Sequence, residues 1–216
     1  SISDPQLSSD GNYLAYVFAE SDWEANRQIS HIWMKDLSSG EESRQLTFSP
    51  EGESNPLWSP DGKTLAFLSR RHGNKHNQLF LLNRAGGEGR QLSDHPTAVS
   101  NPQWSPDGQY LYYLASDELT PEEKKRQEAK DDVYAFDEDY RQRHLWRISI
   151  ADGSRIALTS GDFSMLSYQL SDDGRHILHQ RGPNPLYDDA PKGEIWIMDA
   201  DGNNARALTA NTIAEG

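Results

Sequence analysis

The sequence contains no cysteine and no long apolar run. Its longest uninterrupted apolar stretch, Tyr13 to Ala19, is far short of the roughly 20 residues that a helix needs to cross a bilayer. Without cysteine there is no disulfide, no thiolate zinc site and no cysteine nucleophile. No basic segment followed by an apolar one opens the chain, so a secretory signal has either been removed or lies outside it. We therefore predict no membrane partner, and the cytoplasm is favoured over the periplasm.

Basic residues are also in short supply. The chain has 34 Asp and Glu against 21 Lys and Arg, which gives a formal net charge of −13. Such a balance opposes binding to a phosphate backbone. We predict no nucleic-acid partner.

Hydrophobic residues make up only 35% of the 216 residues, yet six Trp and nine Tyr are present. A polar chain of this kind can fold if its apolar residues recur periodically and each unit buries only a thin layer. This composition directs attention to internal repeats.

Four blocks align without gaps on an Asp-Gly pair. They are residues 4–11, 55–62, 101–108 and 167–174. After each block, large apolar or aromatic residues stand two positions apart, which is the period of a β-strand. These residues are Leu14 and Tyr16, Leu65 and Phe67, Leu111 and Tyr113, and Ile177 and His179.

A second set of matching segments completes each repeat. A third strand is expected at Ile32-Trp33, Leu79-Phe80, Leu145-Trp146 and Ile195-Trp196, and each unit closes on a Leu-Thr or Leu-Ser pair. Four short strands per unit, repeated with aromatic and Asp-Gly positions, indicate an all-β fold made of β-propeller blades. We predict one partial propeller domain over 1–216, with blades at about 1–47, 48–93, 94–159 and 160–209, and with 210–216 leading into a further blade.

The blocks also predict local structure. In Ser59-Pro60-Asp61-Gly62, Pro presets φ for a type I turn and Gly accepts a positive φ, so a hairpin joins the first two strands. The tryptophans of the first and third strands are expected to pack between blades. They are Trp58, Trp104, Trp33, Trp146 and Trp196.

The long connections all join second strands to third strands, at about 19–29, 70–77, 116–143 and 181–193. In an up-and-down blade these connections share one face, which is either a binding face or a place where insertions are tolerated. Arg70, Arg71 and Arg181 begin such connections and are our candidates for substrate contact, because arginine can hold a peptide carboxylate in a bidentate pair. The alternative is that they pair with the chain's many acids.

The insertion at 117–143 carries its own signals. Thr120-Pro121-Glu122-Glu123 is a capping box, which predicts a short solvent-exposed helix continuing to Lys130. Beyond it, the apolar residues 133–136 lie between acidic residues at 131–132 and 137–139. They are expected to dock on the propeller or on another domain, or else the acids hold a cation or a basic peptide.

No catalytic constellation is present. The sequence has no Gly-x-Ser-x-Gly and no phosphate-binding loop. His72 and His76 lie in a turn-prone segment, His176 and His179 face opposite sides of a strand, and the acids at 199–203 suit a turn better than a calcium loop. We predict no catalytic residue, metal or cofactor in this chain.

The repeat has a recognisable likeness. Units ending Asn-Pro-x-Trp-Ser-Pro-Asp-Gly, with Leu-Ala-Phe-Leu-Ser-Arg at 65–70 and Gly-Arg-Gln-Leu-Ser at 89–93, resemble the repeat of TolB-type proteins and of the prolyl oligopeptidase family of serine peptidases. The segment 30–33 and the charged insertion resemble that family's acylaminoacyl-peptidase-like or dipeptidyl-peptidase-like branch. No family catalytic residue maps onto a position of this chain.

The resemblance implies a function for a larger protein. In the family, about seven blades cap a hydrolase domain that carries a Ser, Asp and His triad and restrict entry to short peptides. We expect this chain to be the substrate-gating part of such a serine oligopeptidase, with its peptide substrate met through the missing hydrolase domain. The alternatives are a non-catalytic TolB-like module that binds proteins, and a propeller enzyme with its own central site. If the blades do not close, the isolated chain should self-associate.

Overall fold

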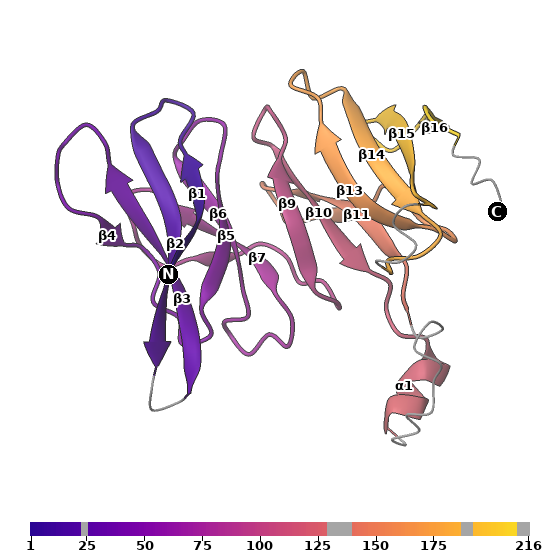
Figure 1. The fold of residues 1–216 in the computed structure, drawn as a ribbon, viewed down its shortest axis with the longest axis horizontal. Helices are drawn as coiled ribbons and strands as arrows, with labels where there is room; N and C mark the ends of the chain where they lie inside the picture. Colours follow the sequence, from indigo (N-terminus) through magenta and orange to yellow (C-terminus); the bar gives the residue numbers. More distant parts are fainter. Residues whose placement is uncertain (23–25, 129–139, 187–191, 211–216) are drawn as a thin grey trace. The chain divides into compact units, whose positions relative to one another are not determined.

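The computed structural model describes residues 1–22, 26–128, 140–186 and 192–210. It contains four antiparallel four-stranded sheets, one per predicted blade, and among the described residues a single short helix (Figure 1). Hydrogen-bonded neighbours follow chain order in every sheet, as in the meander of an up-and-down blade. The predicted all-β propeller blades are confirmed. The chain divides into two compact units, residues 1–113 with 148–154, and residues 114–147 with 155–216.

Each blade has three long strands and a very short last one. The first blade consists of β1 (Ile2–Leu7), β2 (Tyr13–Asp22), β3 (Arg27–Asp36) and β4 (Arg44–Gln45). The second consists of β5 (Glu53–Trp58), β6 (Thr64–Ser69), β7 (Gln78–Asn83) and β8 (Arg90–Gln91). The third consists of β9 (Val99–Trp104), β10 (Tyr110–Ser116), β11 (Arg143–Ser149) and β12 (Arg155–Ala157). The fourth consists of β13 (Ser164–Leu170), β14 (His176–Gly182), β15 (Glu194–Asp199) and β16 (Arg206–Ala207).

The connections agree with the sequence in the second and third blades. In the fourth blade, β14 continues to Gly182, so Arg181 lies in a strand rather than at the start of the predicted connection 181–193. In the first blade, β2 and β3 continue to pair as far as Asp22 and Arg27, so the hairpin is longer, and its connection shorter, than the predicted 19–29. The helix α1 (Pro121–Glu128) lies in the long connection of the third blade (Figure 1). Its predicted capping box is present, because the Thr120 N–H donates to Glu123 Oε2 at 2.6 Å and the Glu123 N–H donates to Thr120 Oγ1 at 3.2 Å.

The first hairpin turn of every blade is held by one serine and one aspartate. In the second blade, Ser59 Oγ donates to Asp61 Oδ1 at 2.7 Å, and the Lys63 N–H donates to the same oxygen at 3.0 Å. The hydrogen bond from Ser59 lowers the pKa of Asp61, and Gly62 takes a φ of 66° as predicted. The same bonds recur at Ser8 and Asp10, Ser105 and Asp107, and Ser171 and Asp173. The predicted hairpins are confirmed.

The residue before each strand proline adopts a conformation that the sequence reading did not anticipate. Asp4, Asn55 and Asn101 have φ values of 48°, 51° and 48°. Asn and Asp tolerate this left-handed region, and the following proline cannot donate a ladder hydrogen bond. The strand register shifts between Ser54 and Leu57, which marks a β-bulge at the Asn-Pro pair.

Apolar side chains meet between blades rather than in one central core. In the first two blades, Ala15, Ile32 and Met34 pack in one cluster with Phe67 and Phe80. The indole N–H of Trp58 donates to the carbonyl of Gln6 in the preceding blade at 3.1 Å, and that of Trp104 donates to the carbonyl of Leu57 at 3.0 Å. The predicted role of the first-strand tryptophans is confirmed. The third-strand tryptophans, Trp33, Trp146 and Trp196, are only half-buried.

A hydroxyl after the short last strand closes every blade. Thr47 Oγ1 accepts the N–H of Ile32 at 2.9 Å. The last strand, β4, ends at Gln45, so this hydroxyl takes the place of a strand carbonyl as the acceptor. The equivalent bonds join Ser93 to Leu79, Thr159 to Leu145 and Thr209 to Ile195, at 2.8, 2.9 and 2.9 Å. The Leu-Thr and Leu-Ser pairs of the repeat therefore have a physical function.

Removing this closing hydrogen bond should cost more stability in a blade where it is buried than in a blade where it is exposed. Thr47→Val keeps the shape of the side chain but leaves the buried Ile32 N–H without an acceptor and removes a donor from the buried Glu53 carboxylate, so the free energy of unfolding should fall by about 1–3 kcal/mol. The matched control is Thr209→Val, where the bond is exposed and water can replace the hydroxyl, so the loss should stay below about 0.5 kcal/mol. Urea unfolding followed by tryptophan fluorescence measures both. Equal losses would contradict this assignment.

Candidate functional site

The topology gives each blade two different ends. The connections between second and third strands lie at one end, here called the loop face, together with the starts of the first strands. The tight turns lie at the other end, here called the turn face. In the first unit, a cavity lies at each of these ends.

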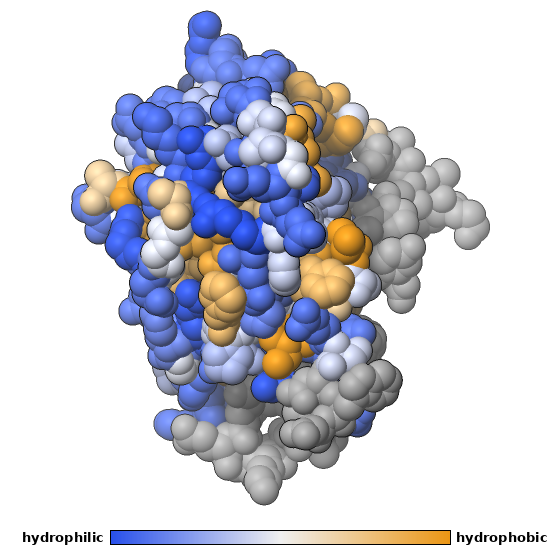
Figure 2. All heavy atoms as spheres, turned by 90° about the vertical axis from the view of Figure 1, so that its left-hand side faces the viewer, coloured by the Kyte–Doolittle hydropathy of each residue, from blue (hydrophilic) through white to orange (hydrophobic). Residues whose placement is uncertain are grey.

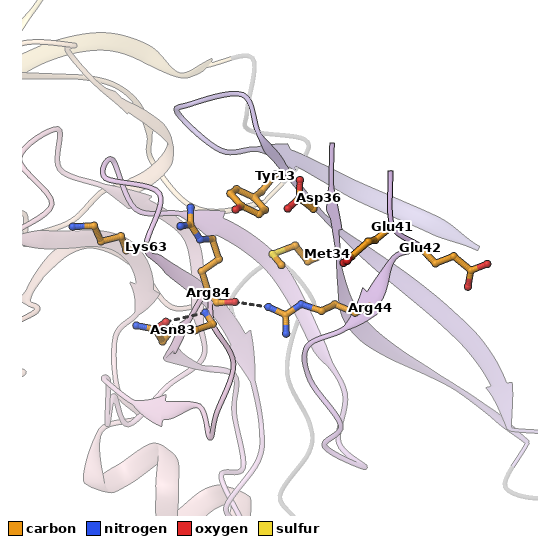
Figure 3. Close-up of a pocket in the computed structure, with 10 residues that line it drawn as sticks. Tyr13, Met34, Asp36, Glu41, Glu42, Arg44, Lys63, Asn83 and Arg84 are labelled. Carbon is orange, nitrogen blue, oxygen red and sulfur yellow. Dashed lines mark hydrogen bonds between the residues drawn. The ribbon is translucent and has the colours of Figure 1, made fainter. Parts of the chain in front are cut away.

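The turn-face cavity has a volume of about 470 Å³, and Figure 3 shows its charged lining. The guanidinium of Arg84 lies 4.2 Å from the ring centroid of Tyr13 and donates to the carbonyl of Gly62 at 3.2 Å. Arg44 donates to the carbonyl of Arg84 at 2.6 Å. Hydrogen bonds from the Ser38 hydroxyl and N–H lower the pKa of Asp36. These groups hold neighbouring turns together, so they are already engaged.

The loop-face cavity has a volume of about 420 Å³. It differs from the turn-face cavity in the pairing of its cationic side chains. Arg70, Lys75 and His76 line it, and all three are exposed. Within the described part of the chain, none of the three has a hydrogen-bond or ion-pair partner. The predicted candidate Arg70 is therefore at a cavity, and it is joined there by two residues that the sequence reading did not select.

Arg71 points elsewhere although it follows Arg70 directly. Its guanidinium is buried, donates to Glu53 Oε1, and lies 5.1 Å and 5.3 Å from the ring centroids of Phe67 and Phe80. The structure thus pairs this candidate with an acid, which was the alternative stated for it.

Glu53 is a fully buried carboxylate shared between two blades. Besides Arg71, it accepts the Thr47 hydroxyl at 2.7 Å and the Ser49 N–H at 3.1 Å, and His31 Nδ1 lies 2.9 Å from its Oε2. The aligned positions of the other blades hold the apolar residues Ile2, Val99 and Met165. An acidic residue at a position that is apolar in the other blades was therefore the sequence signal that could have indicated the Glu53–Arg71 pair.

A glycine makes room for the guanidinium. A Cβ placed on Gly89 would lie 3.0 Å from both Arg71 Nη1 and Phe67 Cζ. The third glycine of Gly86-Gly87-Glu88-Gly89, interpreted from sequence only as part of a loose turn, thus allows Arg71 to approach.

Arg181, the third candidate, lies in the second unit against aromatic rings. Its guanidinium carbon is 3.0 Å from the ring centroid of Trp196 and 4.5 Å from that of Phe163. Burial lowers its pKa, and Glu194 faces it across the strand pair β14–β15. Arg70 and Arg71 belong to the first unit and Arg181 to the second.

His176 and His179 differ as expected for residues on opposite faces of β14. His176 is exposed and His179 is buried. Burial, reinforced by the positive charge of Arg181, lowers the pKa of His179 to about 4. His179 is therefore a packed side chain in the column that holds Tyr16, Phe67 and Tyr113 in the other blades.

The lowered pKa of His179 predicts acid sensitivity. Between its ordinary pKa of 6.5 and about 4, the unfolded chain binds a proton that the folded chain does not, so stability falls as the pH drops through this window. Between pH 7 and pH 5 this costs about 2 kcal/mol. His179→Phe, which introduces the residue type of Phe67 in the same column, should reduce the drop by that amount. His176→Gln, at an exposed site on the same strand, should leave it unchanged, and urea titrations at both pH values test this.

Other predicted features take structural roles or fall outside the described residues. Asp201 accepts the Asn203 N–H at 2.9 Å, so this segment is a turn, as interpreted. In the described ranges, no three His, Asp or Glu side chains cluster as metal ligands do, and no helix is long and apolar enough to span a membrane. The apolar and acidic residues at 131–139 lie outside the described residues.

Known proteins show the same repeat. Residues 1–122 match the family model described as TolB beta propeller domain. The "Uncharacterized peptidase YuxL" of Bacillus subtilis (strain 168) is 38% identical over 87 residues, a match that covers 40% of this chain and 13% of that protein.

Solved structures share the fold at low sequence identity. The acylaminoacyl peptidase of Pyrococcus horikoshii aligns with a TM-score of 0.67 at 18% identity, over 97% of this chain and 32% of that one. TolB from Acinetobacter baumannii aligns with a TM-score of 0.63 at 20% identity, over 98% of this chain and 44% of that one. The family match spans more than half of the 216 residues, and the sheets have the blade topology, so the chain belongs to the TolB beta propeller domain family.

Proposed function

We propose that this chain is the substrate-gating propeller portion of a serine oligopeptidase whose hydrolytic residues lie outside it. The observation that carries the proposal is the asymmetry of the blades. Turns on the turn face are short, whereas at the loop face the third blade carries the helix α1 and the first unit has a cavity whose cations Arg70 and Lys75 have no ion-pair partner among the described residues. The match to a protein named a peptidase supports the same assignment.

A segment that restricts substrate entry has to extend into the path of the substrate, and it needs no catalytic residue. The long connection of the third blade begins after Ser116 and places α1 in it, with Glu118 and Lys124 forming a surface ion pair at 3.5 Å. A helix with so few apolar residues has little to bury, so it suits an arm that stands in the path of a substrate. The absence of a nucleophile elbow from the sequence is compatible with hydrolysis elsewhere.

The second candidate function is a non-catalytic propeller that binds proteins. The TolB family match favours it. The reading frame beyond residue 216 separates the two, because a gate requires further blades followed by Gly-x-Ser-x-Gly with Asp and His after it. A frame without a hydrolase domain would favour the binding module.

The gating role is tested by deleting residues 118–130 from the full-length protein. Peptides longer than those normally accepted should then be cleaved, while turnover of a small ester should remain unchanged, because the hydrolytic site is untouched. The ester is the internal control for a folded hydrolase. An unchanged peptide-length profile with normal ester turnover would contradict the gating role of this insertion.

A further inference from the structure

The loop-face cavity has the chemistry of a carboxylate site. Its exposed cations, Arg70 and Lys75, have no ion-pair partner among the residues that the structure describes, although the chain as a whole is strongly acidic. Two such cations at one cavity can act together on a single anion.

The acids at the cavity do not neutralise it. Glu53 is buried and its charge is balanced by Arg71. Glu51 is exposed, and a hydrogen bond from the Ser49 hydroxyl lowers its pKa, so it contributes one negative charge. Arg70 and Lys75 together with Glu51 leave about one positive charge, which matches a monoanion better than a dianion.

The remaining polar groups suit a peptide. The amide side chains of Gln28 and Asn77 line the same cavity, and an amide can donate to a peptide carbonyl and accept a peptide N–H. The hydroxyls of Ser30 and Ser54 add further donors and acceptors. A volume of about 420 Å³ lies within the range of small-ligand sites.

We infer that the loop-face cavity binds the C-terminal carboxylate of a short peptide through Arg70 and Lys75. Arg70 supplies a bidentate pair and Lys75 a second charge-assisted hydrogen bond. The inference rests on the proposed function for the choice of a peptide as ligand. The carboxylate site itself lies wholly within this chain.

Binding to the 216-residue chain tests the inference without a hydrolase domain. The probe is a dye-labelled Gly-Gly-Ala tripeptide with a free carboxylate, compared by fluorescence anisotropy with the same peptide carrying a C-terminal amide. The amide should bind at least tenfold more weakly. Arg70→Gln should weaken the acid about tenfold, and the double change Arg70→Gln with Lys75→Gln should abolish the difference between acid and amide.

Two controls make the result specific. Lys63→Gln removes the same charge from the second blade at the turn-face cavity and should not change binding. Inorganic phosphate should compete poorly, and thermal unfolding should show that every variant is folded. Equal binding of acid and amide, loss of binding in Lys63→Gln, or competition by phosphate at least as strong as by the acid would each overturn the inference. Because no cleavage is measured, failure of the gating experiment leaves this result unaffected, and the reverse also holds.

Discussion

Replacing Arg71 by Met should lower the free energy of unfolding by about 3–5 kcal/mol, because it leaves the buried carboxylate of Glu53 without its cation. The Thr47 hydroxyl and the Ser49 N–H still donate to that carboxylate, and His31 Nδ1 still lies 2.9 Å from its Oε2, but none of these groups replaces the buried guanidinium. Methionine retains much of the contact with Phe67 and Phe80, so the loss reports the charge more than the volume. Urea unfolding at pH 7 measures the effect.

Two further variants separate the ion pair from general damage. Glu53→Val combined with Arg71→Met removes both charges and introduces the residue found at Val99, in the same column of the third blade. The double variant should therefore be more stable than Arg71→Met alone. Arg70→Met, at the exposed neighbouring position, should change stability by less than about 0.5 kcal/mol. A double variant less stable than the single one would contradict the assignment.

The blades were predictable because several independent sequence signals mark each of them. The Asp-Gly blocks, the period of two and the Leu-Thr endings all placed strands where the structure has them, and the structure explains these signals as turn and closing hydrogen bonds. The bulge at Asn55-Pro56 was not predicted, because a strand pattern does not show which residue adopts a left-handed φ. The extended hairpin at Asp22 and Arg27 was missed because polar residues can continue a ladder whose bonds are made by the backbone.

The sequence predicted which end of the blades carries the candidate site, but not which residues form it. The sequence indicated which connections share an end of the blade, but it could not separate Arg70 from Arg71, which are adjacent and chemically identical. The two side chains point in different directions. Arg71 turns toward Glu53 through the space left by Gly89, whereas Arg70 stays at the surface. Arg181 likewise owes its environment to rings on other strands, Phe163 and Trp196.

Equivalent positions in the four blades show which sheet faces lack a neighbour. The leucines that close the first three blades, Leu46, Leu92 and Leu158, are 6–9% exposed, whereas the matching Leu208 of the fourth is 47% exposed. Ile195 is 41% exposed, although its counterparts in the first three blades are fully buried. At the first blade, Leu7 is 58% exposed where Trp58 is 7% exposed, and Figure 2 shows apolar surface among hydrophilic residues on that side.

We therefore expect the 216-residue chain to self-associate through these sheet faces, because apolar columns built to be covered by a blade favour association when they are exposed. Ile195→Lys should shift the population toward monomer, since a charge in that column is costly to bury. The matched control is Ile156→Arg, which is equally exposed but lies in a column where the other blades carry Arg44, Arg90 and Arg206. Light scattering across a concentration series should show a mass above the 24.4 kDa of one chain for the unmodified protein and the control, and a lower mass for Ile195→Lys. A monomeric unmodified chain that unfolds cooperatively would refute the expectation, as would an equal shift in both variants.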